Sequence, residues 1–141
     1  MDKLEMAQRC KDVLWKSDKA SPALGIKITV AEAGTATAIM EIREDMMNGF
    51  GVCHGGLVFA LADTAFAFAC NGYNEQTVAA SCHIEFIRPA VLGDVLTAIA
   101  TEDYRGRKNG HYTIAVQNQD QELVALFRGR SSSIGKTICD D

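Results

Sequence analysis

The longest run of apolar residues lies in the middle of the chain, over residues 57–70. The polar side chains inside this run are Asp63 and Thr64, and Asp63 carries its single charge. Two glycines precede the run, and an Asn-Gly pair at 71–72, which is a strong signal for the end of a helix, follows it. The pattern predicts a helix over about 55–70 that is apolar on nearly all sides.

The segments on either side of this run alternate between apolar and polar positions, with the period of a helix in residues 2–17 and the period of a strand elsewhere. Residues 2–17 predict an amphipathic helix, because Asp2 and Glu5 have the spacing of a capping box. Its apolar face is expected to hold Met6, Cys10, Val13 and Leu14. Pro22 is expected to end this helical region, and residues 44–56 form a glycine-rich loop. Alternating segments bounded by turn signals predict strands at 24–32, 35–43, 77–89, 93–104, 111–119 and 123–135. The tail, 136–141, is expected to fray.

This order of elements is typical of an α+β fold, because the helices are separate from the runs of strands. Short connections favour antiparallel pairing, so we expect one antiparallel sheet of about six strands in a single domain of residues 1–141. Such a sheet covers only one side of the apolar helix at 55–70. A helix that is apolar all round must be covered on its other side too, which predicts a homodimer with this helix near the interface.

Composition narrows the class of protein. The chain has 141 residues, of which 48% are hydrophobic and 23% charged, with a net charge of -4. This balance is typical of a globular domain and argues against a dedicated nucleic-acid binder, which would have a basic face. The five cysteines lack the spacing of zinc ligands, and no segment has the length of a signal peptide's apolar core or the ~20 apolar residues of a membrane helix. We therefore expect a cytoplasmic protein with free thiols, no metal site and no membrane contact.

The helix at 55–70 has two features that can support chemistry. Gly55 and Gly56 lack a Cβ, so a ligand can approach the backbone at the positive end of the helix dipole. Such an end binds an anion or an oxygen that becomes negative during a reaction, although a loop can also need glycine simply to turn. Burial of Asp63 would raise its pKa, as a general base or nucleophile requires. The alternative is a structural carboxylate that binds a backbone amide or a buried arginine.

The spacing of these two features restricts how they can act together. Asp63 is eight residues after Gly55, which is about 12 Å along a helix at ~1.5 Å per residue. A reacting carbonyl must lie about 3 Å from both its hydrogen-bond donors and the attacking group. One helix cannot place both groups on one carbonyl. We therefore expect Gly55 of one chain to lie opposite Asp63 of a second copy.

Four stretches of the sequence resemble one known family. They are "MNGFGVCHGGLVFALADTAFAFACN", "VAASCHIEFIRPAVLGDVLTAIA", "GRKNGHYTIAVQNQDQELVALFRGRS" and the closing "SSIG". Over about 24–135 the chain is similar to the PaaI-type hotdog-fold thioesterases of phenylacetate degradation. The resemblance implies a hotdog fold, in which an antiparallel sheet wraps a long central helix. It also implies dimers, usually paired into tetramers, that hydrolyse acyl-CoA thioesters such as phenylacetyl-CoA and its ring-hydroxylated relatives. Coenzyme A would be part of the substrate, and no separate cofactor is implied.

The resemblance also implies roles for particular residues. Asp63 matches the catalytic carboxylate, which activates water or attacks the substrate directly. Gly55 matches the residue whose backbone N–H polarises the thioester carbonyl. Asn48 and His54 match residues that position the carbonyl or the attacking water. The apolar stretch "GFGVC" before His54 departs from the family pattern, which leaves the preferred acyl group open.

Further substrate contacts are expected around this centre. Gly56 and Thr64 are predicted to contact the substrate from the helix. Arg88, Arg128 and Arg130 lie late in predicted strands, and arginine binds phosphate through two parallel hydrogen bonds. We expect these three arginines to hold the nucleotide phosphates of coenzyme A, against the alternative that they are ordinary surface charges.

Other kinds of site fit the sequence less well. Cys53 and His54 could suggest a thiol nucleophile, but adjacent residues in an extended loop point apart. A metal site formed by His54, Asp63, Cys82 and His83 has no supporting spacing.

Two alternative functions remain open at this stage. A hotdog dehydratase acting on 3-hydroxyacyl-CoA would pair Asp63 with His54, and it would form an enoyl thioester without releasing a thiol. A non-catalytic acyl-CoA binding module would bind the ligand without turnover.

Overall fold

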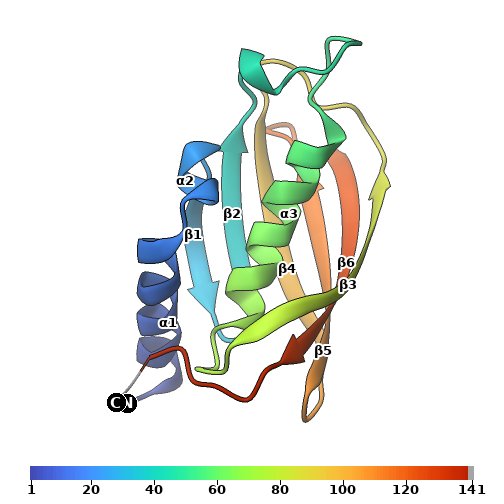
Figure 1. Cartoon of the computed structure of the whole chain (residues 1–141). Helices are drawn as coiled ribbons and strands as arrows, with labels where there is room; N and C mark the ends of the chain where they lie inside the picture. Colours follow the sequence, from blue (N-terminus) through green and yellow to red (C-terminus); the bar gives the residue numbers. More distant parts are fainter. Residues whose placement is uncertain (140–141) are drawn as a thin grey trace.

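A six-stranded antiparallel sheet curls around one long helix in this computed structural model, which describes residues 1–139 (Figure 1). The helical elements are α1 (Lys3–Ser17), α2 (Ala20–Ala23), the 3-10 turn η1 (Glu44–Met46) and the long helix α3 (Gly55–Cys70). The strands are β1 (Lys27–Glu32), β2 (Thr35–Glu41), β3 (Thr77–Phe86), β4 (Val95–Arg105), β5 (Asn109–Gln117) and β6 (Leu123–Ser133). The expected α+β arrangement is confirmed.

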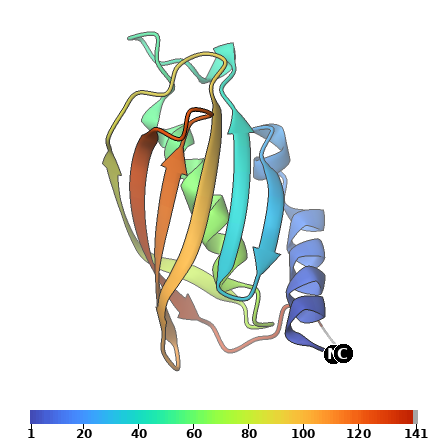
Figure 2. The same ribbon diagram turned by 180° about the vertical axis from the view of Figure 1, so that it is seen from behind.

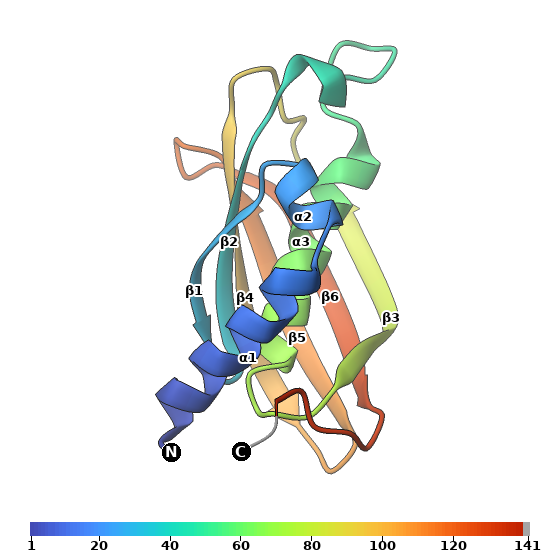
Figure 3. The same ribbon diagram turned by 60° about the vertical axis from the view of Figure 1, so that its left-hand side comes forward.

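The sheet has one face packed on α3 and one face without a helix. Its strand order is β1-β2-β4-β5-β6-β3, and each neighbouring pair is antiparallel. β3 and β1 are therefore the two edge strands. α1 lies beside β1 (Figure 3), where Gln8 Nε2 donates to the carbonyl oxygen of Ala31 at 2.9 Å. Figure 2 shows the opposite face of the sheet, which no helix within residues 1–139 covers.

Local interactions define both ends of α3. His54 is the N-cap residue, and its Nδ1 accepts a hydrogen bond from the Gly56 N–H at 3.0 Å. Asn71 is the C-cap residue, and Gly72 follows it without a positive φ. Glycine is needed at 72 for space, because a Cβ there would lie 2.8 Å from the carbonyl oxygen of Glu32. The helix bounds expected from the sequence are confirmed, but the terminating glycine acts through close packing, not through a left-handed turn.

The sheet covers only one side of α3, as expected. The fully buried side holds Leu61, Ala62, Ala65, Phe66 and Ala69. The opposite side is partly exposed and holds Phe59, Ala60, Asp63, Thr64 and Ala67. The charged residue of the helix therefore lies on the side that the chain's own sheet leaves open.

Three details of the N-terminal region differ from the sequence-based prediction. Val13 is 44% exposed, whereas Ala7 and Cys10 are buried in α1. Pro22 lies within the short helix α2 and does not end the helical region, which is possible because proline is tolerated in a first helical turn. Gly25 then adopts a φ of +73°, and this turn delays the start of β1 relative to the expected strand.

The segment after β6 is attached to the connection between α3 and β3. The backbone N–H and the Nε2 of Gln76 donate to the carbonyl groups of residues 136–137 at 2.8 and 2.9 Å. The Oδ1 of Asn74 accepts hydrogen bonds from the N–H groups of residues 138–139 at 3.0 and 2.9 Å. The expected fraying is therefore wrong up to residue 139, and residues 140–141 lie outside the described part of the chain.

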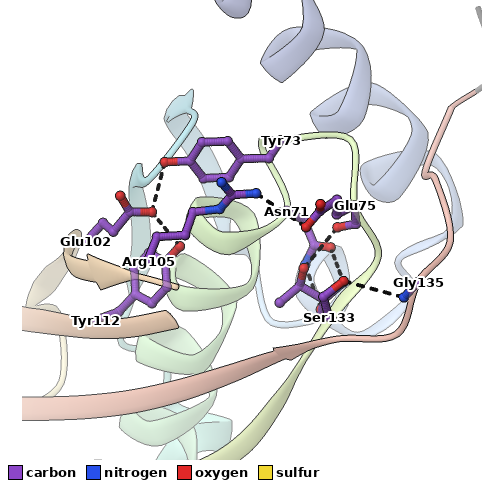
Figure 4. A network of polar contacts seen from close by, with 9 residues as sticks. Asn71, Tyr73, Glu75, Glu102, Arg105, Tyr112, Ser133 and Gly135 are labelled. Atoms are coloured by element: carbon purple, nitrogen blue, oxygen red, sulfur yellow. Dashed lines mark hydrogen bonds and ion pairs between the residues drawn. The ribbon is translucent and has the colours of Figure 1, made fainter. Parts of the chain in front are cut away.

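A polar network fixes the same connection onto the sheet (Figure 4). The hydroxyl groups of Tyr73 and Tyr112 both donate to Glu102 Oε1, at 2.8 and 2.9 Å. Arg105 stacks on the Tyr73 ring at 3.7 Å and pairs with Glu75 at 3.3 Å. Burial and the hydrogen bond to Glu102 raise the pKa of Tyr73 to about 12. These contacts join the α3–β3 connection to β4 and β5, and so they position the start of the edge strand β3.

We expect Gly129→Ala to destabilise the fold, because a Cβ at this position would lie 2.7 Å from two ring atoms of Phe66. That ring is buried and packs against the rings of Tyr112 and Phe127. Overpacking of this kind costs about 1–3 kcal/mol, which corresponds to a melting temperature lower by several degrees. Thermal unfolding measures the change, with Gly49→Ala as the control because a Cβ there meets nothing within 4 Å. Equal melting temperatures for both variants would contradict the packing argument.

Candidate active site

Asp63 lies in the middle of α3, on its open side. Its carboxylate forms no hydrogen bond or ion pair with any residue in 1–139. Burial and, after it, the charge of Asp63 raise the pKa of the Cys82 thiol in the neighbouring edge strand β3. Burial raises the pKa of Asp63 above its ordinary value of 3.8. A half-buried carboxylate without a partner in its own chain is available to accept a proton.

The first turn of α3 presents two backbone N–H groups in different states. The Gly56 N–H is bound by the His54 Nδ1. The Gly55 N–H has no hydrogen-bond partner among residues 1–139. The end of α3 thus has a donor that remains free for a ligand, at the positive end of the helix dipole.

His54 and Asn48 are held in the loop that leads into α3. Because Nδ1 of His54 accepts a hydrogen bond, the proton of the neutral ring is on Nε2, which makes Nε2 a donor. The His54 N–H donates to the carbonyl oxygen of Met46 at 2.8 Å. Asn48 Oδ1 accepts from the N–H groups of Phe50 and Val52 at 2.9 and 3.3 Å. Its Nδ2 donates to no residue in 1–139, so both side chains keep one donor available.

A cavity of about 320 Å³ opens beside Gly55. It is mainly apolar, and Arg88 supplies the one charged side chain of its lining. The ring of Phe86 stands against Gly55, since a Cβ on that glycine would lie 3.1 Å from the nearest ring carbon. The residues that line the cavity are Val52, Cys53, Gly55, Val58, Phe86, Ile87, Arg88, Pro89, Ala90 and Val124.

The three arginines expected to form one phosphate site do not lie together. Along β6, Phe127 and Gly129 face α3, so Arg128 and Arg130 point to the opposite face of the sheet. There Arg128 lies 3.8 Å from Asp103, and Arg130 donates to Asn109 Oδ1 at 3.2 Å. Arg88 lies in the cavity beside Gly55 and pairs with Glu122 at 3.2 Å. Within one chain the alternation of β6 therefore turns Arg128 and Arg130 away from the helix and from Arg88. Binding of the coenzyme A phosphates by these arginines stays a prediction.

Two other expected substrate contacts have their polar groups occupied. The Thr64 hydroxyl donates to the carbonyl oxygen of Ala60 at 2.7 Å and lies 3.5 Å from Ser21 Oγ of α2. The Gly56 N–H is bound by His54, as described above. In this chain Gly56 takes part in the cap of the helix, and Thr64 contacts α2.

The alternative sites considered from the sequence do not form either. The Cys53 thiol donates to the carbonyl oxygen of His54 at 3.5 Å, and burial raises its pKa, so Cys53 and His54 are not a thiol–imidazole pair. Ile84 and Phe127 pair on the helix side of the sheet, which places His83, paired with Arg128, on the outer side. Among residues 1–139, no group of three or more histidine, cysteine or acidic side chains is close enough to hold a metal ion.

Sequence reasoning missed Phe86, and it considered Cys82 only as a metal ligand, although both residues lie near the candidate centre. Both lie in β3 on the side that faces α3, because their partners in β6 are Gly129 and Ala125. The alternation of β3 indicated which residues share a face, but not which face meets the helix. That depends on the register between β3 and β6, which the sequence pattern does not specify.

The candidate site is centred on a helix that an antiparallel sheet wraps. Both the sequence and the structure of the chain are similar to those of known proteins. The family described as Thioesterase superfamily matches residues 50–125. The chain is 46% identical over 125 residues to the acyl-coenzyme A thioesterase PaaI of Escherichia coli, covering 89% of both chains. It is 35% identical over 127 residues to a putative esterase of Archaeoglobus fulgidus, covering 90% of this chain and 82% of that one.

Among solved structures, the E. coli PaaI protein from the phenylacetic acid degradation operon is similar with a TM-score of 0.94. The identity is 43%, and the match covers 96% of this chain and 99% of that one. The fold is therefore a hotdog fold, which confirms the expectation from the sequence. With its family match and its close relatives, the chain belongs to the thioesterase superfamily.

We expect Asp63→Asn to raise the melting temperature at pH 7. The raised pKa means that the folded state disfavours the ionised carboxylate, so this group lowers stability as the pH rises through its folded pKa. The gain from asparagine should shrink as the pH falls from the raised folded pKa towards 3.8, and it should vanish below 3.8, where the wild-type carboxyl becomes protonated in both states. Thermal unfolding from pH 7 to pH 4 measures this, with Asp120→Asn at an exposed turn as the control. A lower melting temperature than wild type at pH 7 would contradict it.

Proposed function

We propose that this protein is an acyl-CoA thioesterase that hydrolyses phenylacetyl-CoA, its ring-hydroxylated relatives, or similar aryl and medium-length acyl-CoA thioesters. The observation that carries the proposal is that α3 holds both a carboxylate, on Asp63, and a backbone N–H, on Gly55, that have no partner among residues 1–139. The similarity to the E. coli acyl-coenzyme A thioesterase PaaI supports it. Coenzyme A enters as part of the substrate, and the proposal requires no separate cofactor.

The chemistry follows from the groups on α3. Asp63 accepts a proton from water while the water oxygen bonds to the thioester carbon. The carbonyl oxygen becomes negative and is stabilised by the Gly55 N–H at the positive end of α3. The carbon–sulfur bond then breaks, and the leaving thiolate takes up the proton that Asp63 holds. In a second route Asp63 attacks the carbon itself, and water hydrolyses the resulting anhydride to the same products. Asn48 and His54 supply further donors for the carbonyl or the water.

The proposal includes a homodimer whose active sites combine both chains. In the continuous helix α3, Gly55 and Asp63 are about 12 Å apart along the axis, too far to act on one carbonyl. The open side of α3 and the exposed edge strand β3 are the surfaces that a second copy would cover. Pairing there would remove the unpaired edge of β3 and bring Gly55 of one chain towards the partner's Asp63.

A second level of assembly and a location complete the proposal. The outer face of the sheet carries Val95, Tyr104 and Leu126 as exposed apolar side chains, which supports pairing of two dimers through that face. No helix within residues 1–139 has the length and apolar character needed to span a membrane. All five cysteines are free thiols, in keeping with the cytoplasmic location that we propose.

We expect the wild-type protein to release free thiol from phenylacetyl-CoA in a panel of aryl- and alkyl-acyl-CoA thioesters, measured with a thiol-reactive dye. Asp63→Asn should lower kcat about 10²–10⁴-fold, which is the usual contribution of a general base. Asp120→Asn is the matched control and should keep the wild-type rate. Each variant is checked for folding by circular dichroism.

The same panel separates the two alternative functions. A 3-hydroxyacyl-CoA dehydratase would form an enoyl thioester, seen by its ultraviolet absorbance, and would release no thiol. A binding module would show equal affinity and no turnover in both the wild type and Asp63→Asn. Absence of thiol release from every thioester of the panel would overturn the proposed function.

We expect two inactive variants, Asp63→Asn and Gly55→Pro, to regain activity when they are unfolded together and refolded as mixed dimers. In a mixed dimer, one of the two sites receives both an intact Asp63 and an intact Gly55 N–H. Proline removes the N–H, is tolerated at the first helical position, and fits the extended ψ of 129° at His54. Thiol release after refolding is the measurement.

Gly55→Ala is the matched control for the mixing experiment, because it adds a Cβ near Phe86 but keeps the N–H. Light scattering establishes that each variant assembles. Mixed dimers that form and stay inactive would show that both groups act within one chain, contrary to the proposal.

A further inference from the structure

Phe86 is an aromatic side chain that remains substantially exposed next to the free end of α3. It is the last residue of β3, and 55% of it is exposed. Three of its ring carbons lie 3.1, 3.3 and 3.6 Å from the position that a Cβ of Gly55 would occupy. The ring therefore stands directly beside the residue whose N–H is free.

The backbone at this point is held firmly. Phe86 pairs with Ala125 of β6, and the following N–H groups of Ile87 and Arg88 both donate to the carbonyl oxygen of Val124, at 2.8 and 3.2 Å. The position of the ring thus follows from the sheet, and it does not depend on a loop. A side chain on such a backbone is suited to hold a ligand in one orientation.

The ring adds little to the core. It is not among the buried residues packed around α3, and it forms one wall of the 320 Å³ cavity that Gly55 and Val58 also line. Exposure of so much aromatic surface is unfavourable for folding alone, because apolar surface in contact with water costs free energy. A ligand in the cavity would cover the part of the ring that lines it, in addition to whatever a second copy covers along β3.

Gly55 and Phe86 also constrain each other. A side chain at 55 would push the ring away, so glycine at this position keeps the ring in contact with the helix backbone. The ring thus occupies the space on the Cβ side of Gly55, next to the free N–H. The arrangement restricts the direction from which a carbonyl oxygen reaches that N–H.

We propose that Phe86 is a positioning residue, whose ring orients the thioester carbonyl on the Gly55 N–H and keeps water from that N–H. This inference rests on the proposed acyl-CoA thioesterase function. Because the ring stands at Gly55, it contacts the atoms beside the thioester carbonyl that all acyl-CoA substrates share. Its effect is therefore on the rate of hydrolysis of every acyl group.

The test compares Phe86→Ala, Phe86→Leu and Phe86→Tyr with the wild type on the same thioester panel. We expect Phe86→Ala to lower kcat about 10- to 100-fold by a similar factor for each acyl group, as a displacement of about 1 Å does in other enzymes. The KM should change less than threefold. Phe86→Tyr keeps the ring and should retain most of the rate, and Phe86→Leu should be intermediate.

Tyr104→Ala is the matched control, because Tyr104 is also an exposed aromatic residue, 63% exposed, but lies on the outer side of the sheet. It should leave kcat and KM unchanged. Melting temperatures of the Phe86 variants should stay close to that of the wild type, which separates positioning from a role in folding. The double variant Gly55→Ala with Phe86→Ala should lose less activity than the two single losses combined, since the residues are in contact.

The outcomes distinguish this inference from the function on which it rests. An active wild type with Phe86→Ala at the wild-type kcat would overturn the inference alone, and so would a loss confined to KM. If Phe86→Ala fails to fold, Phe86→Leu and Phe86→Tyr test the role of the ring instead. Equal kcat values for these two variants would also overturn the inference about Phe86. A wild type that releases no thiol from any thioester would overturn the proposed function and this inference with it.

Discussion

The apolar helix α3 has more surface to bury than one curved sheet can cover, and the other features of the protein depend on this imbalance. The sheet takes the side with Leu61 and Phe66 and leaves the side with Asp63 partly open. The edge strand β3, with its unpaired backbone groups, lies next to that open side. The surface that would join two copies is thus also the surface on which the proposed chemistry takes place. Assembly and activity would depend on the same contact.

The beginning of α3 has to satisfy two opposing requirements. A stable helix needs its first N–H groups bound, whereas an oxyanion needs one of them free. In this sequence the N–H groups of the two glycines meet the two requirements separately. His54 caps the helix through the N–H of Gly56, and the N–H of Gly55 stays available. Substitution of His54 would therefore affect the helix end as well as any donor that its ring supplies.

The features that could be predicted from the sequence are those that stand out against their surroundings. A single charge in an apolar run identified Asp63, and two glycines before that run identified the helix end. Alternation located all six strands, but it placed the start of β1 too early because the turn at Gly25 was not recognised. The separation of the three arginines within one chain has a related cause. Arg128 and Arg130 were grouped with Arg88 by residue type. In β6, however, they alternate with Phe127 and Gly129, which face α3, so the two arginines face the other way. Phe86 and Gly55 are far apart in the sequence, and the register of β3 on β6 brings them into contact. No local sequence pattern contains that register.

The sheet also acts as a partition between two surfaces that can change separately during evolution. Asp63 and Gly55 lie on one side of it, whereas His111, Arg128 and Arg130 lie on the other. Because neighbouring residues of a strand face opposite ways, each strand carries two independent sets of positions. Mutations on the outer set would alter the proposed pairing of dimers through that face, while the inner set of positions stays unchanged. Proteins with this fold can therefore differ in the outer face of the sheet while the residues that face the helix stay the same.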